Sequence, residues 1–146
     1  AATVQGEISH TEDYIRLQQI RYPDAIFFMS ETEPDVRDVP MPRLVVQTFA
    51  ENIFKHAFDG QSMLSIFIRA RKICENGTDV CCITVEDSGN GFSEEFLQGL
   101  QRETSTGLRT IRKTMQLSYG REDLLRLHNS EHGGACVELR IPMQKE

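Results

Sequence analysis

The sequence predicts an α+β fold of two layers, in which a mixed, mostly antiparallel sheet of about five strands is covered on one face by about three helices. Two pairs of strand-like runs are joined by short turns that contain glycine, which is typical of hairpins. Three longer stretches carry apolar residues at helical spacing. With 146 residues, of which 39% are hydrophobic, we expect a single domain over residues 1–146, and residues 1–38 supply its first helix and strand.

The N-terminal segment predicts a helix followed by a strand. Ser9 and Glu12 have the spacing of a capping box, and apolar residues follow at helical spacing, so we expect a helix over residues 9–21. The apolar run 25–30 is predicted to be a strand. The acidic, proline-containing stretch 31–38 is predicted to be a loop.

Two hairpins account for most of the predicted sheet. The first joins residues 62–73 to 80–87 through Asn76-Gly77, the strongest short hairpin signal that a sequence offers. The same residues, with Thr78, form a glycosylation sequon, but we interpret them as a turn. The second hairpin joins 124–129 to 135–141.

Between the hairpins the sequence predicts a short helix and a long one. The short helix covers residues 94–100 and is capped by Ser93, and a polar stretch 101–106 follows. The long helix covers residues 107–119 and ends at Gly120.

Composition argues against several classes of partner. Sixteen Lys and Arg against 22 Asp and Glu give a net charge of −6, which argues against nucleic acid or an anionic membrane as the main partner. No stretch approaches the roughly 20 apolar residues of a membrane span. The four cysteines lack the spacing of a zinc site, and we interpret them as small hydrophobic residues in a reducing compartment. The first residue is Ala1 and not methionine, so we expect a piece of a longer protein.

A polar stripe marks the remaining long helix, predicted over residues 42–58 and beginning at Pro42 or Arg43. The helix is apolar around much of its circumference, so we expect it to be largely buried. A polar face on a buried helix contacts water, another polar group or a ligand, and a solvated helix edge explains it equally well. The stripe consists of Thr48, Asn52, Lys55, His56 and Asp59, with Glu51 beside Asn52.

A second motif, Asp87-Ser88-Gly89-Asn90-Gly91, follows directly on an apolar strand. A carboxylate there can accept a hydrogen bond from an exocyclic amine, and Gly89 and Gly91 leave room for a flat ring. A tight turn capped by Asp87 is an equally good explanation.

A third motif, Thr104-Ser105-Thr106-Gly107-Leu108-Arg109, leads into the last predicted helix. The N–H groups and the positive dipole end of a helix N-terminus suit phosphate. An ordinary N-cap by Ser105 or Thr106 explains the same residues.

Taken in order, the three motifs resemble the ATP-binding family shared by histidine kinases, gyrase, Hsp90 and MutL. Residues 51–56 look like its N box, residues 87–91 its first glycine box and residues 105–108 its second. Within that family the chain looks like the LytS/YesM-type bacterial sensor histidine kinases. That closer resemblance is carried by residues 14–22, Val39-Pro40-Met41-Pro42, residues 108–113, residues 117–120 and Gly133-Gly134.

The resemblance implies a role for each motif residue. Asn52 would ligate Mg²⁺, and Asp87 would accept a hydrogen bond from the adenine amino group. Glu51 would act as a base or orient water. Lys55, His56, Ser105, Thr106, Gly107 and Leu108 would contact the phosphates, and Gly89 and Gly91 would admit the ring. Ser105 stands where the family usually has a glycine, which puts nucleotide affinity and turnover in question.

The resemblance also implies a function and partners. The chain would bind ATP and Mg²⁺ and pass the γ-phosphoryl group to a histidine on its receptor's dimerisation domain, from which a response regulator would take it. We expect a monomeric, cytoplasmic domain of a membrane-anchored bacterial receptor that makes no direct membrane contact. It carries no phosphoacceptor motif, so it is not expected to phosphorylate itself. An anti-sigma-type serine kinase of the same fold, or a degenerate module without catalysis, are the alternatives.

Overall fold

The computed structural model describes residues 2–60, 62–98 and 106–143. Along the chain the elements are α1 (Val4–Arg21), β1 (Ile26–Thr32), the 3-10 turn η1 (Pro34–Val36), α2 (Val45–His56), β2 (Leu64–Glu75), β3 (Thr78–Asp87), α3 (Glu94–Leu97), α4 (Thr106–Tyr119), β4 (Leu125–Asn129) and β5 (Ala135–Pro142).

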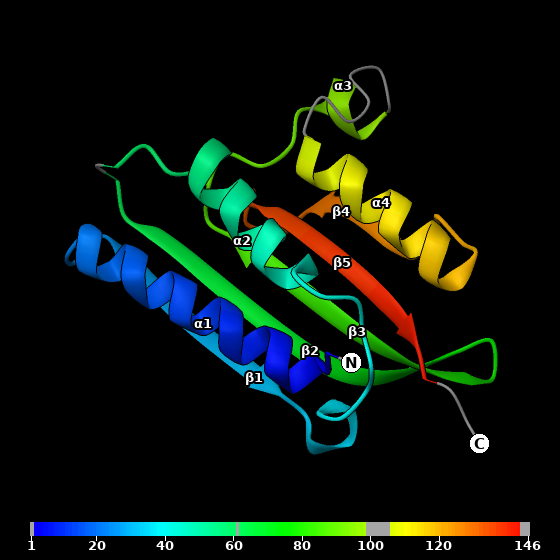
Figure 1. The fold of residues 1–146 in the computed structure, drawn as a ribbon. Coiled ribbons are helices and arrows are strands. Elements are labelled where there is room, and N and C mark those ends of the chain that lie inside the picture. Colours follow the sequence, from blue (N-terminus) through cyan, green and yellow to red (C-terminus); the bar gives the residue numbers. More distant parts are fainter. Residues whose placement is uncertain (1, 61, 99–105, 144–146) are drawn as a thin grey trace.

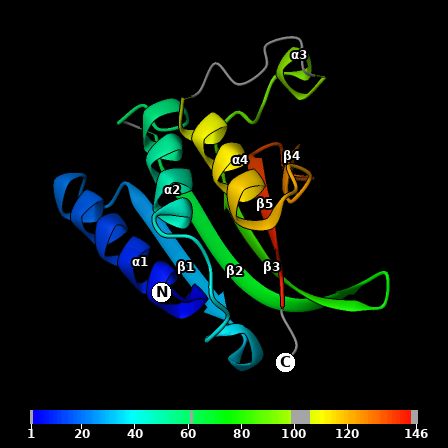
Figure 2. The ribbon, with the colours of Figure 1, turned by 45° about the vertical axis from the view of Figure 1, so that its right-hand side comes forward.

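The five strands among the described residues form one sheet, in the order β1-β2-β3-β5-β4. β1 runs parallel to β2, and the other pairs are antiparallel. Helices α1, α2 and α4 lie side by side over one face of this sheet (Figure 1), and the view in Figure 2 shows the two layers. The predicted two-layer α+β fold is therefore confirmed.

The start of α1 differs from the prediction. The helix begins at Val4, because the Thr3 side chain accepts a hydrogen bond from the Gly6 N–H at 3.2 Å and caps it there. Ser9 and Glu12 lie inside the helix, so the predicted capping box is wrong. Glu12 instead accepts a hydrogen bond from the Ser30 hydroxyl on β1.

The start of α2 also lies later than predicted, at Val45. Leu44 precedes it in the left-handed region, with φ 66°, which costs a residue with a side chain about 1–2 kcal/mol. The carboxylate of Glu7, from α1, accepts the Leu44 N–H at 2.6 Å. This contact fixes the N-terminus of α2 against α1.

The hairpin between β2 and β3 is confirmed. Asn76 and Gly77 both have positive φ, at 53° and 78°, and Glu75 pairs with Thr78 across them. Two left-handed residues in a two-residue loop match the twist of the strands. β1 extends to Thr32, and η1 occupies part of the predicted loop 31–38.

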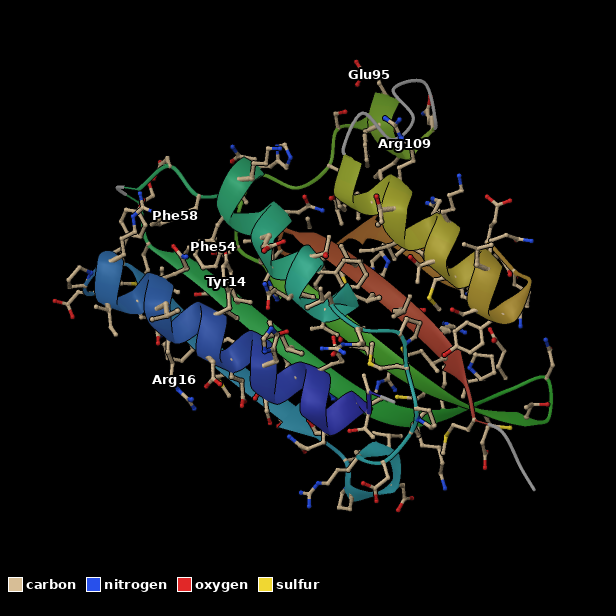
Figure 3. The ribbon with its side chains drawn as sticks, viewed as in Figure 1. Tyr14, Arg16, Phe54, Phe58, Glu95 and Arg109 are labelled. Atoms are coloured by element: carbon tan, nitrogen blue, oxygen red, sulfur yellow. The ribbon has the colours of Figure 1, made fainter. Side chains whose placement is uncertain are left out.

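The core lies between the helices and the sheet. Alternate residues of β2, Leu64, Ile66, Ile68 and Ala70, are buried there. Between α1 and α2 the ring of Tyr14 meets that of Phe54, which in turn meets the ring of Phe58 just beyond the end of α2. Both contacts are edge to face, with ring centroids 5.8 Å apart. Figure 3 shows these three side chains directed toward one another. In the described part of the chain, no helix is both long and apolar enough to cross a membrane.

Candidate functional site

A cavity of about 270 Å³ lies between α2, the end of β3 and the segment that carries α3. Its wall is mostly apolar, as in sites for small organic ligands. Asp87 is the one acidic residue among the described residues that line it. The lining consists of Phe49, Asn52, Ile53, His56, Ala57, Val85, Asp87, Asn90, Gly91, Phe92, Ser93, Phe96, Leu108, Ala135 and Val137.

The last residue of β3, Asp87, lines the cavity and is 9% exposed. Its Oδ1 accepts hydrogen bonds from the Gly89 N–H at 2.8 Å and from the Ala135 N–H at 3.3 Å. Both of these bonds use the same oxygen. Oδ2 receives neither of them, so it is the oxygen that Asp87 can offer to a ligand.

Burial raises the pKa of the Asp87 carboxyl, although the two backbone N–H groups act in the opposite direction. Desolvation is the larger influence. Burying a carboxylate costs free energy on folding, and this cost is typical of a residue kept for binding.

The glycines of the Asp87 motif allow close backbone packing. A Cβ on Gly89 would lie 2.8 Å from the Cβ of Ala57 at the end of α2. Gly91 has φ 78°, and a Cβ there would lie 2.7 Å from Oδ1 of Asn129. A side chain at either position would push the motif away from α2 or β4. Gly91 lines the cavity, whereas Gly89 does not line it and donates its N–H to the Asp87 carboxylate.

The third motif meets the first where α4 begins. A Cβ on Gly107 would lie 3.0 Å from Cγ2 of Thr48 and 3.1 Å from Nδ2 of Asn52. Gly107 therefore lets the start of α4 approach α2 closely. This contact places the α4 N-terminus beside Asn52, and Leu108 forms part of the cavity wall.

The structure does not bring every predicted residue into the cavity. Glu51 is exposed, accepts a hydrogen bond from Gln47 at 3.2 Å and contributes to raising the pKa of Tyr14 on α1, after the larger effect of burial. Lys55 is exposed and does not line the cavity. Asp59 follows α2 and accepts from the Ser62 N–H at 2.7 Å, so it does not continue the polar stripe.

The first half of the third motif cannot be fully described. Thr104 and Ser105 lie outside the described residues, as does most of the predicted polar stretch. Thr106 begins α4, but only its backbone is described.

The sequence analysis missed the aromatic wall of the cavity and the residues behind it. Phe92 and Phe96 stack with their ring centroids 5.2 Å apart and an interplanar angle of 15°. The spacing of these two residues across the Ser93 cap was the available signal. Asn129 and Ala135 reach the site from the second hairpin, and no local pattern marks them.

The described side chains offer few ligands for a metal ion on their own. In the described ranges, no three His, Cys, Asp or Glu residues are grouped so that they could hold a metal ion. Asn52 lines the cavity, and its side-chain oxygen is of the type that binds Mg²⁺.

The fold and the cavity together define a two-layer α+β domain with a cavity between its helices and the end of a central strand. The chain belongs to the histidine kinase-, DNA gyrase B-, and HSP90-like ATPase family, whose model matches residues 37–145. This places the cavity in a family of ATP-binding domains.

Relatives and solved structures agree with this assignment. The chain is 28% identical to sensor histidine kinase YesM of Bacillus subtilis over 145 residues, covering 99% of this chain and 24% of YesM. It is 28% identical to sensor protein LytS of Enterococcus faecalis over 153 residues, covering 98% of this chain and 25% of LytS. The chain thus spans about a quarter of the length of these curated relatives.

The fold is shared with histidine kinase catalytic domains. The catalytic domain of histidine kinase ThkA matches with a TM-score of 0.76 at 19% identity, covering 97% of this chain and 93% of that one. The blue-light activated histidine kinase of Erythrobacter litoralis EL346 matches with a TM-score of 0.69 at 22% identity, covering 97% and 42% of the two chains.

Proposed function

We propose that this chain is the ATP-binding catalytic domain of a sensor histidine kinase. It binds ATP with Mg²⁺ and transfers the γ-phosphoryl group to a histidine on the dimerisation domain of its own receptor. A response regulator then receives the phosphoryl group. The names of the relatives support the kinase assignment, and the geometry of Asp87 supports the nucleotide site.

The observation that carries the proposal is the Asp87 carboxylate. Backbone N–H groups occupy Oδ1, so Oδ2 is available to accept a hydrogen bond inside an otherwise apolar cavity. An adenine ring offers an exocyclic amine as donor and a flat apolar surface, which matches that wall. A guanine ring would present a carbonyl oxygen at the equivalent exocyclic position, and two acceptors would then face each other.

The phosphate end of the nucleotide is proposed to lie toward α4. Gly107 and Leu108 bring the N-terminus of this 14-residue helix beside Asn52, where the N–H groups of the first turn and the helix dipole favour anionic groups. His56 lines the cavity and Lys55 lies one residue before it, so both are proposed to meet phosphates. Ser105 and Thr106 are proposed to contribute to the same contacts.

The metal is proposed to be held by Asn52 together with phosphate oxygens. Mg²⁺ typically uses few protein ligands beside the phosphates of its substrate, so one amide oxygen fits a site without an acidic cluster among the described residues. Bound Mg²⁺ supplies charge neutralisation for phosphoryl transfer. The chain's own residues orient the nucleotide, which is the main contribution a protein makes to this reaction.

Glu51 is proposed to act on the acceptor. It lies next to Asn52 on α2 but outside the cavity, so a role as base requires the acceptor histidine to approach from the solvent side of α2. The acceptor domain, the response regulator and an anchored receptor in the membrane all belong to this proposal.

Calorimetric titration of ATP tests the adenine site, with Asp87→Asn as the variant. The introduced amide keeps an acceptor for the Gly89 and Ala135 N–H groups but presents an NH₂ donor to the adenine amine. We expect wild type to bind and Asp87→Asn to lose about 2–4 kcal/mol, at least thirtyfold in affinity, because a charged acceptor is replaced by a donor. Glu86→Gln is the matched control, because it makes the same charge change one residue earlier, on the opposite face of β3. Equal affinity in wild type and Asp87→Asn would contradict the assignment.

Magnesium and phosphotransfer are tested separately. Asn52→Ala is expected to abolish the Mg²⁺ dependence of ATP binding, and an unchanged dependence would refute the metal assignment. Phosphate transfer from ATP to a supplied receptor dimerisation domain, giving acid-labile phosphohistidine, would support the kinase. Acid-stable phosphoserine on a target would support the serine kinase alternative.

A further inference from the structure

The side chain of Asn129, the last residue of β4, pairs with the backbone of Phe92. Its Oδ1 accepts the Phe92 N–H at 2.7 Å, and its Nδ2 donates to the Phe92 carbonyl oxygen at 2.9 Å. Phe92 lies beyond the end of β3 and belongs to none of the described strands. One amide side chain therefore satisfies both polar backbone groups of a residue that has left the sheet.

The contact is built into the surrounding backbone. Gly91, directly before Phe92, has a positive φ, and a Cβ there would lie 2.7 Å from Oδ1 and 3.0 Å from Cγ of Asn129. The chain can approach Asn129 this closely only because position 91 has no side chain.

Phe92 is the first residue of the aromatic wall. It stacks on Phe96, and both rings line the cavity. Asp87 lines the same cavity. The path of the backbone at Phe92 therefore determines where the stacked pair lies relative to Asp87. Asn129 hydrogen-bonds to the backbone of Phe92, where the segment that carries both rings begins.

The residue that pairs with Asn129 across the hairpin contacts Asp87 in the cavity wall. Asn129 pairs in register with Ala135, and the Ala135 N–H donates to Oδ1 of Asp87. The end of the β4–β5 hairpin thus contacts both the carboxylate and the root of the aromatic wall.

We propose that Asn129 is a positioning residue for nucleotide binding, which holds Phe92 and Phe96 at the spacing from Asp87 that a flat purine ring requires. The inference rests on the proposed function and extends it to a residue outside the three motifs. Asn129 itself does not line the cavity.

Asn129→Ala tests this role, with His128→Ala as the matched control. Both residues are exposed at the end of β4, so neither change leaves a buried hole. Of the two, Asn129 is the one that pairs with Phe92. The measurements are the affinity for ADP by calorimetry, the melting temperature, and the hydrogen exchange of the Phe92 amide by NMR without nucleotide.

We expect Asn129→Ala to stay folded, to lose protection of the Phe92 amide and to bind ADP about tenfold more weakly, in the range for one or two neutral hydrogen bonds. His128→Ala should leave all three measurements unchanged. A merely structural role would lower the melting temperature without a selective loss of ADP affinity.

Two results would overturn the inference in different ways. If wild type binds ADP and Asn129→Ala binds it equally well after losing Phe92 protection, the positioning role fails and the proposed function stands. If wild type binds no adenine nucleotide, the proposed function fails, and the positioning role fails with it.

Discussion

Two neighbouring glycines in the β4–β5 turn should respond differently to alanine substitution. Gly133 has φ 96° and open space around it, whereas a Cβ on Gly134 would overlap the Asp87 carbonyl oxygen and lie 2.8 Å from its carbon. Gly133→Ala therefore introduces backbone strain but no steric clash. Gly134→Ala introduces a steric clash with the backbone of Asp87.

The magnitudes follow from what must move. Alanine in the left-handed region costs about 1–2 kcal/mol, so Gly133→Ala should lose about that much. At Gly134 the obstacle is backbone, and β5 must separate from the end of β3. The overpacking costs about 1–3 kcal/mol, and losing the Ala135 hydrogen bond to the Asp87 carboxylate adds about 1.5–3 kcal/mol. The total of about 2.5–6 kcal/mol is a large part of the stability of a typical domain.

Urea denaturation followed by circular dichroism measures both variants. We expect Gly134→Ala to be the less stable by about 2–3 kcal/mol, with unchanged dependence on urea, and to lose ATP affinity because Asp87 shifts. A Gly133→Ala variant as unstable as Gly134→Ala would refute the close approach of the turn to Asp87.

Three further predictions concern other parts of the chain. Leu44→Gly should raise the free energy of unfolding in urea by about 1 kcal/mol, because Leu44 has a positive φ and is 51% exposed; a loss would show that Leu44 is not left-handed. A thiol reagent should label Cys74 alone in the native protein and all four cysteines after denaturation, and rapid labelling of a second native thiol would contradict the burial of the other three. The unreactive thiols are Cys81, Cys82 and Cys136, and burial raises the pKa of Cys81 and Cys136 to about 12. Because burial raises the pKa of Asp87, the folded protein binds that proton more tightly than the unfolded chain, and wild type loses stability relative to Asp87→Asn as the pH rises through this pKa. Urea unfolding should show that the stability of wild type relative to the variant falls as the pH rises from 4 to 7; a difference that stays constant with pH would argue against this linkage.

Much of the fold and part of the site could be predicted from local patterns. Hairpin turns depend on adjacent residues, and Asn76-Gly77 forms the turn that its sequence predicts. Asp87 was found because it ends an apolar strand and precedes two glycines. The predicted start of α1 is wrong because both Thr3 and Ser9 are residue types that cap helices. Local sequence does not show that the helix begins at the earlier one, Thr3.

The angular position of each residue around α2 explains why only some residues of the polar stripe line the cavity. Successive residues on a helix differ by about 100°, so Asn52 faces the cavity while its neighbour Glu51 does not line it. Spacing alone identifies which residues share a face. It does not identify what that face contacts.

The sequence by itself determined the fold class, the order of the three motifs and the carboxylate that ends β3, because periodicity, turn chemistry and chain order are local properties. The tertiary structure decided which distant residues support the motifs. Glu7 hydrogen-bonds to Leu44, and Asn129 to Phe92, each pair 37 residues apart in the sequence. Ala135 hydrogen-bonds to Asp87, 48 residues away. Such contacts depend on the register of the strands and the packing of the helices, so they arise only when the whole sheet and its helical layer have assembled.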